Sequence, residues 1–277
     1  MNRSPLCRIL CAFAIAVSCT GRAFAQNEAA DDVFKPAEPD FTLIGLPTAL
    51  RVPKYKSAFR VTHRFLRPLN NDGDFGDVAG DLFGLDNGAQ IGLEYRFGLV
   101  PGGQIGFHRT SDKTIEFFGA YSVLRQGARS PLELAAIASI EGLDNFTESK
   151  TPALGAVLSR TVGTHAAFYV EPIWVNNSNP LPTELVDHND TFMIGLGARV
   201  RVRPTVYVVA EASPRVAGFK PGSTHGGFAI EKHAGGHQFQ LNFSDSYGTT
   251  MGQIARGGLS QTTTNWYLGF NISRKFF

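Results

Sequence analysis

The stretch "TNWYLGFNISRKFF", residues 264–277, ends the chain with a strictly alternating pattern. Apolar side chains occupy every second position, namely Trp266, Leu268, Phe270 and Ile272, and polar or small residues fill most of the gaps. A period of two predicts a strand with one apolar and one polar face. In a soluble protein the apolar face would point inward, and in a membrane barrel it would point outward. The rest of the chain has to distinguish the two.

The first 25 residues have the pattern of an export signal. Arg3 and Arg8 form a basic start, residues 9–17 are all apolar, and residues 23–25 read Ala-Phe-Ala, a small-x-small cleavage pattern. The apolar run is shorter than the ~20 residues that a membrane-spanning helix needs. We therefore expect cleavage before Gln26, with an uncleaved anchor or a lipoprotein at Cys19 as less favoured alternatives.

Cysteine content and charge exclude several function classes. All three cysteines, Cys7, Cys11 and Cys19, lie inside the predicted signal, so the exported chain would have no disulfide, cysteine nucleophile or haem attachment site. The chain has 26 basic residues, and removing the three arginines of the signal leaves 23 against 24 acidic residues. This near-neutral balance argues against a nucleic-acid partner. Because no later segment has the long apolar run of a membrane helix, membrane residence would require a barrel.

Alternating segments recur from Ser57 to the end of the chain. We count twelve: residues 59–65, 90–97, 102–110, 114–123, 132–140, 153–160, 166–174, 192–200, 205–212, 226–232, 237–245 and 264–277. Apart from "TSDK" at 110–113, short and long connections alternate between them. Short periplasmic turns and long outer loops are typical of an outer-membrane barrel, whereas a sandwich has no reason to sort loop length in this way.

The sequence thus predicts an all-β protein: a closed antiparallel up-and-down transmembrane β-barrel of about 12 strands over residues 56–277. Residues 26–55 form a periplasmic lead-in that docks on the barrel or plugs it. The last strand should pair with the first, because each unpaired backbone group in hydrocarbon costs several kcal/mol. The expected partners are outer-membrane lipids and, through the last strand, the barrel-assembly machinery; the oligomeric state is open.

Two residues complicate this pattern. Phe276, rather than the terminal Phe277, continues the lipid-facing row, so either the final residue hangs free or the strand contains a bulge. His63 also falls on the lipid-facing side of its strand, where the headgroup level would suit it.

Several segments together resemble a known family. They are "FRVTHRFLRPLN" (59–70), "FGLDNGAQIGLEYRFG" (83–98), "TSDKTIEFFGAYSVLRQ" (110–126), "GGHQFQLNFSDS" (235–246) and "NWYLGFNISRKF" (265–276). They resemble an uncharacterised bacterial family of outer-membrane β-barrels that carries a domain-of-unknown-function label. The resemblance spans roughly Leu46 to Phe276. It implies a barrel, and it implies no activity, substrate or catalytic residue.

The polar faces of the strands carry charges of both signs, which we expect to point into the lumen. The set is Arg60, Arg64, Glu94, Arg96, His108, Glu116, Glu133, Glu171, Arg199 and Glu211. These side chains either line a pore and select its solutes, or form a neutralised ion-pair network that fills the barrel. Eight strands leave a filled interior and sixteen to eighteen an open channel, so twelve strands leave both possibilities open.

Metal sites and catalytic groups are weakly indicated. His233 and His237 flank a tight turn, and Asn70, Asp72 and Asp74 have calcium-loop spacing, but position six of that loop is Phe75 rather than glycine. A lipid hydrolase or acyltransferase would need a serine and a histidine to converge at the outer rim. His188 and His225 have Ser178 and Ser223 nearby in sequence, without any ordered motif. We therefore expect no metal, no cofactor and no enzyme activity.

The function that the sequence predicts is a passive pore or transporter for small hydrophilic solutes in the bacterial outer membrane. The alternative is a closed barrel with a structural, binding or surface-interaction role and no transport. A soluble exported sandwich is the third possibility.

Overall fold

The computed structural model describes residues 35–69, 80, 88–258 and 265–277. Within these residues the chain forms a single antiparallel sheet of thirteen strands and two short helices. The helices are α3 (Leu143–Phe146) and α4 (Met251–Arg256). The strands are β1 (Ser57–Phe65), β2 (Ala89–Val100), β3 (Gly103–Thr110), β4 (Ile115–Leu124), β5 (Glu133–Gly142), β6 (Glu148–Val162), β7 (Ala166–Asn176), β8 (Asp190–Arg203), β9 (Val206–Ser213), β10 (Arg215–Gly218), β11 (His225–Ala234), β12 (His237–Ser244) and β13 (Tyr267–Phe276).

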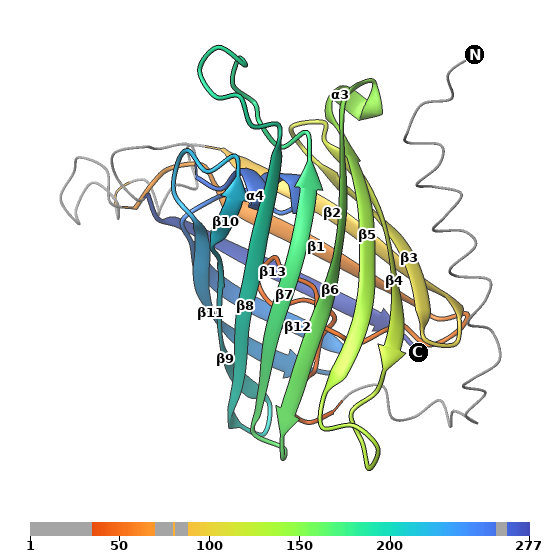
Figure 1. The fold of residues 1–277 in the computed structure, drawn as a ribbon. Helices are drawn as coiled ribbons and strands as arrows, with labels where there is room; N and C mark the ends of the chain where they lie inside the picture. Colours follow the sequence, from red (N-terminus) through yellow and green to blue (C-terminus); the bar gives the residue numbers. More distant parts are fainter. Residues whose placement is uncertain (1–34, 70–79, 81–87, 259–264) are drawn as a thin grey trace, which may run out of the picture. The chain divides into compact units, whose positions relative to one another are not determined.

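The sheet closes on itself (Figure 1). Each strand from β1 to β9 pairs with the next, β11 continues from β9, and β13 returns to β1. The short β10 continues the line of β9 after Pro214 and pairs with the outer part of β8, so the two count as one strand of the wall. Twelve strands therefore form the wall, in a closed antiparallel barrel, as the sequence predicted. Closure leaves no open edge whose backbone groups would face hydrocarbon.

The two faces of the wall differ as the alternation predicted. On β3, Phe107 is 44% exposed on the outer face, whereas the neighbouring His108 is 1% exposed on the inner face. Leu93 and Glu94 on β2 differ in the same way. A sandwich would bury the apolar row, so the exposed apolar belt identifies the outer face as the lipid-facing one.

The seam between the first and last strands is regular. The register runs without a shift from the pair Ser57–Phe276 to the pair Arg64–Gly269. β13 ends at Phe276, so the terminal Phe277 lies beyond the strand and no bulge is needed. His63 is on the outer face, where its ring stacks on Phe270 with centroids 4.6 Å apart.

Most connections separate by length between the two ends of the barrel. Short turns at 101–102, 163–165, 204–205 and 235–236 lie at one end, which we assign as periplasmic, and the longer connection 125–132 lies at the same end. The connections with α3 and α4 lie at the other end (Figure 1), although the one with α3, residues 143–147, is shorter than 125–132. The exception expected at 110–113 is present, since β3 and β4 are joined by residues 111–114. In the described part of the chain, no helix is long and apolar enough to cross a membrane.

Candidate functional site

Residues 35–54, which we call the lumen segment, fold inside the barrel. Its apolar side chains are almost fully buried: Phe41, Leu43, Ile44, Leu46, Leu50 and Val52 are at most 4% exposed. Leu43, Ile44 and Leu46 belong to one core cluster with wall residues that include Tyr169, Ile173 and Met193. The lumen of this barrel therefore holds a hydrophobic core in addition to polar groups, and burial of that core stabilises the segment in place.

The carboxylate of Glu211 on β9 binds the turn of the lumen segment. It accepts hydrogen bonds from three consecutive backbone N–H groups, those of Ile44 and Gly45 at 2.9 Å and that of Leu46 at 3.2 Å. The ring Nε2 of His225 lies 3.0 Å from the same carboxylate. Hydrogen bonds to an ionised acceptor are about twice as strong as neutral ones, so Glu211 is the strongest single anchor of the segment.

Wall side chains also satisfy the carbonyl groups of the segment. Gln240 donates to Leu43 O and Asn271 to Ile44 O, both at 2.9 Å, and Arg199 donates to Thr42 O at 2.6 Å. An irregular buried backbone cannot leave its polar groups unpaired. The polar faces of β8, β9, β12 and β13 thus supply the partners that this buried segment needs.

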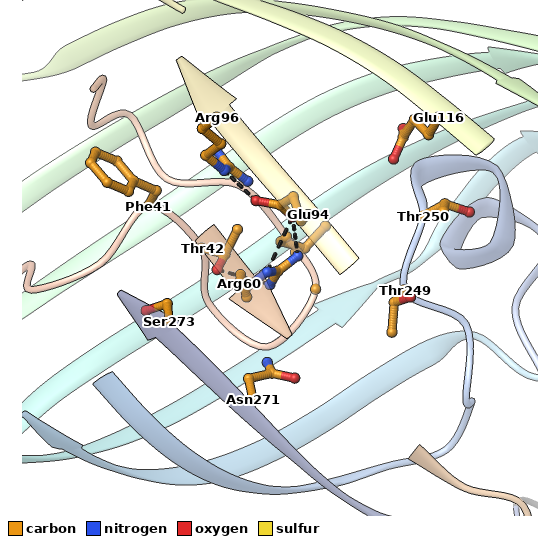
Figure 2. A network of polar contacts seen from close by, with 12 residues as sticks. Phe41, Thr42, Arg60, Glu94, Arg96, Glu116, Thr249, Thr250, Asn271 and Ser273 are labelled. Atoms are coloured by element: carbon orange, nitrogen blue, oxygen red, sulfur yellow. Dashed lines mark hydrogen bonds and ion pairs between the residues drawn. The ribbon is translucent and has the colours of Figure 1, made fainter. Parts of the chain in front are cut away.

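Two buried ion-pair clusters complete this network. Arg60 and Arg96 both pair with the carboxylate of Glu94, and Arg60 also donates to Thr42 Oγ1 at 2.9 Å (Figure 2). On the opposite wall, Arg199 forms two hydrogen bonds of 2.9 Å with Glu231. Glu94 thus serves two arginines and Glu231 serves one, and such counter-charges are the condition under which buried ions are tolerated.

The connection that carries α4 closes the outer end. Thr250 caps α4 in a capping box with Gln253, and its hydroxyl donates to Glu141 on β5. Arg256 pairs with the same carboxylate, and Met251 N–H donates to Glu116 at 3.3 Å. Figure 2 shows Glu116 beside this turn. Glu116 and Glu141 therefore hold α4 against the wall.

Among the described residues, two cavities lie on either side of the α4 connection. The inner cavity has a volume of about 60 Å³ and lies between the lumen segment and β4–β6, with Thr249 and Met251 at its outer boundary. The outer cavity, about 370 Å³, opens among the outer loops and is lined in part by Gly248 and Gln253. Asp245 lies on the outer cavity, and burial raises the pKa of its carboxyl although His225 lies near it.

The predicted lumen-facing residues are all buried within the barrel. They are Arg60, Arg64, Glu94, Arg96, His108, Glu116, Glu133, Glu171, Arg199 and Glu211. Five of them, Arg60, Glu94, Arg96, His108 and Glu116, meet at the inner cavity, whereas Arg199 and Glu211 contact the lumen segment. Glu141 and Glu231 belong to the same network but were not among the lumen-facing residues predicted from the sequence. Glu141 lies one residue beyond the segment 132–140 on its inner face, and Glu231 lies on the inner face of the segment 226–232, so the alternation could have identified both.

Arg51 and Glu171 are among the buried charged groups that keep atoms without a hydrogen-bond partner in the described residues. Nε and Nη2 of Arg51 have no hydrogen-bond partner there, and neither does either carboxylate oxygen of Glu171. Arg51 is 5% exposed and Glu171 is fully buried. Leaving a buried charge unpaired costs several kcal/mol, so these groups mark positions where the network is incomplete.

The histidines do not form the sites that their spacing suggested. The described residues contain no group of three side chains able to hold a metal ion, and His237 instead contacts Arg274, at 2.8 Å. Ser178 bonds to Thr191, and His225 contacts Glu211. Among described residues, neither Ser178 nor Ser223 forms a hydrogen bond with a histidine. The calcium-like loop at 70–77 lies outside the described residues.

Solved structures similar to this chain are outer-membrane barrels. Outer membrane phospholipase A from Escherichia coli is 11% identical over 80% of this chain and 90% of its own, with a TM-score of 0.45. Omp33 from Acinetobacter baumannii is 10% identical over 82% of this chain and 100% of its own, with a TM-score of 0.46. A variant of the Rh. blastica porin is 13% identical over 72% of this chain and 58% of its own, with a TM-score of 0.36.

No curated protein matches the chain. A family described as "Membrane bound beta barrel domain (DUF5777)" matches residues 40–276, which covers the barrel and nearly all of the apolar part of the lumen segment. This match confirms the resemblance seen in the sequence. The protein belongs to the DUF5777 family of membrane-bound β-barrels.

Proposed function

We propose that the protein resides in the bacterial outer membrane as a channel for small hydrophilic solutes, which the lumen segment holds closed. One observation carries the proposal: the wall is complete without the segment. The pairing of β1 with β13 closes the ring. Before Lys54, no residue of the lumen segment forms a backbone β-bridge with any described strand. Its bonds to the wall come from side chains. The segment can therefore leave the lumen without breaking the backbone hydrogen bonds between the strands. A twelve-stranded ring would then enclose an open lumen.

The charged side chains support this role in a specific way. Arg60, Glu94 and Arg96 would line the lumen once the segment is withdrawn, and they already border the inner cavity. Because their charges alternate in sign, we expect weak discrimination between cations and anions. Nothing in this arrangement requires a cofactor.

A cysteine pair can test this function, because the only cysteines in the chain are Cys7, Cys11 and Cys19. An ideal Cβ on Gly197 would lie 2.2 Å from Cδ1 of Leu43. Leu43→Cys with Gly197→Cys, in a background with serine at the three native cysteines, therefore places two thiols close enough for a disulfide. We expect no conductance in planar bilayers when the pair is oxidised and channel openings after reduction. The single variant Leu43→Cys, treated in the same way, is the control.

Deletion of residues 35–52 gives the complementary measurement. We expect a barrel that retains heat-modifiable gel mobility and conducts continuously. A folded deletion variant without conductance would contradict the channel proposal.

That outcome would favour the second candidate, a permanently closed barrel with a structural or surface-binding role. The observation behind this candidate is the apolar cluster of the segment, since Leu43, Ile44 and Leu46 are each at most 1% exposed. Such complete burial would keep the segment in the lumen at all times.

A further inference from the structure

We infer that the inner cavity is a binding site for one small monovalent anion, of the chloride or formate class. The argument starts from Arg51, the one arginine of the lumen segment. Its Nη1 donates to the carbonyls of Thr48, at 2.8 Å, and Leu50. Its Nε and Nη2 have no partner among the described residues, although Arg51 is 5% exposed and lines the cavity.

The charges around the cavity do not cancel. Arg60 and Arg96 share the single carboxylate of Glu94, and no described carboxylate lies within ion-pair distance of Arg51. Glu116, the other acidic residue of the lining, also accepts from Met251 at the α4 turn. The lining therefore contains three guanidinium groups against two carboxylates, a surplus of one positive charge within the lining; Glu133 and Glu171 act on Arg51 from outside it.

The surplus indicates an anion rather than water alone. Water can accept hydrogen bonds from Nε and Nη2 of Arg51, but it does not neutralise a charge that has been removed from solvent. The forked N–H groups of arginine suit a small anion. His108 also lines the cavity and is 1% exposed.

The size of the cavity limits the ligand. About 60 Å³ accommodates roughly four water-sized molecules at 10–15 Å³ each. Chloride or formate fits with one or two waters, whereas gluconate is too large. The remaining wall is built from small or apolar side chains such as Ala120, Ile137 and Ala153, so recognition comes from the arginine side.

Thermal unfolding of the purified protein in detergent tests the site. The midpoint is measured in sodium chloride, sodium formate and sodium gluconate at equal ionic strength. We expect a saturable rise with chloride and no rise with gluconate; formate tells whether the site accepts small carboxylates as well as halides. At ten times its dissociation constant, one bound anion raises the midpoint by about 3–6 °C in a domain of this size.

Three variants identify the site. Arg51→Gln should abolish the chloride effect, and the exposed Arg203→Gln at the β8–β9 turn should leave it unchanged. If Arg51→Gln does not fold, Ala120→Met provides the same test, because it fills the cavity and keeps the arginine. Equal midpoints in chloride and gluconate, or a chloride effect that survives both variants, would overturn the inference.

Crystals grown in bromide give a direct readout. We expect an anomalous peak in contact with the guanidinium group of Arg51, and water alone at that position would refute the site. Both measurements use the closed protein. The anion site can therefore fail while the channel proposal stands, and it can stand if the protein never conducts.

Discussion

The two sides of the lumen differ in the side chains that they present to the lumen segment. On the anchoring side, β8, β9, β12 and β13 present long polar side chains that bind the lumen segment, among them Glu211, Gln240 and Asn271. On the cavity side, β4–β6 present small or apolar side chains such as Ala120 and Ala153, and space remains. The turn of the segment at 42–46 is thus bound mainly from the anchoring side, whereas the two ends of the segment are also bound elsewhere: Lys35 pairs with Glu133 on β5 at 2.8 Å, and Val52 N–H donates to Gln104 on β3 at 3.0 Å. Beside the turn, the free space lies on the cavity side.

The largest effect is expected from Glu211→Gln, a substitution on the anchoring side. The variant keeps the size of the side chain but removes the charge that three backbone N–H groups share. We expect a loss of about 3 kcal/mol in the free energy that holds the segment, because one partner of a buried charge-assisted network is removed.

Thiol labelling measures the release of the segment. Thr48→Cys, at a fully buried position of the segment, should react faster with a soluble maleimide when Glu211→Gln is also present. Unchanged labelling would show that Glu211 is not the main anchor.

Glycines provide the next test. Gly197 on the anchoring side has no room for a Cβ, which would lie 2.2 Å from Leu43 Cδ1, whereas a Cβ on Gly119 would have only Gln104 O nearby, at 3.7 Å. We expect Gly197→Ala to destabilise the segment by about 1–3 kcal/mol, as overpacking of a core does, and Gly119→Ala to have little effect. Denaturant unfolding followed by gel mobility compares the two, and equal midpoints would contradict the tight packing.

The sequence predicted the wall better than its contents, for a physical reason. A strand face in a barrel repeats every second residue, so the inward direction of Glu94 or Arg199 follows from counting. The lumen segment has no such period. Its neighbours include β1, which follows it directly, and β8, β9, β12 and β13, which are far away in sequence. The unpartnered Nε and Nη2 of Arg51 could be identified only from the three-dimensional structure.

The segment also explains why the alternation could not separate a pore from a filled barrel. Polar side chains that would line a water-filled channel are the same residue types that satisfy a buried backbone. Asn271 is an example: its position on the polar face of β13 is evident from sequence, but its bond to Ile44 O is not.

A smaller effect should separate two alanines that both face inward. Ala153 lines the cavity, while Ala229 on β11 is 1% exposed in the core cluster and does not line it. Ala153→Val should change stability by less than about 1 kcal/mol, because the added methyl groups enter empty space, and Ala229→Val should cost about 1–3 kcal/mol. The unfolding midpoints of the two variants, measured in the same detergent, test this prediction. A larger loss for Ala153→Val than for Ala229→Val would contradict the placement of the free space beside Ala153.

The smallest effect is expected at Glu171, which is the control position for Glu211. Both are fully or nearly buried glutamates on the inner face, yet neither oxygen of Glu171 has a hydrogen-bond partner among the described residues. Glu171→Gln should leave stability unchanged or raise it by up to about 1 kcal/mol, because it removes a buried charge that no partner compensates. Denaturant unfolding beside Glu211→Gln gives the comparison. A loss as large as that of Glu211→Gln would mean that Glu171 neutralises Arg51 across the lumen, and the anion inferred in the inner cavity would then lose its electrostatic basis.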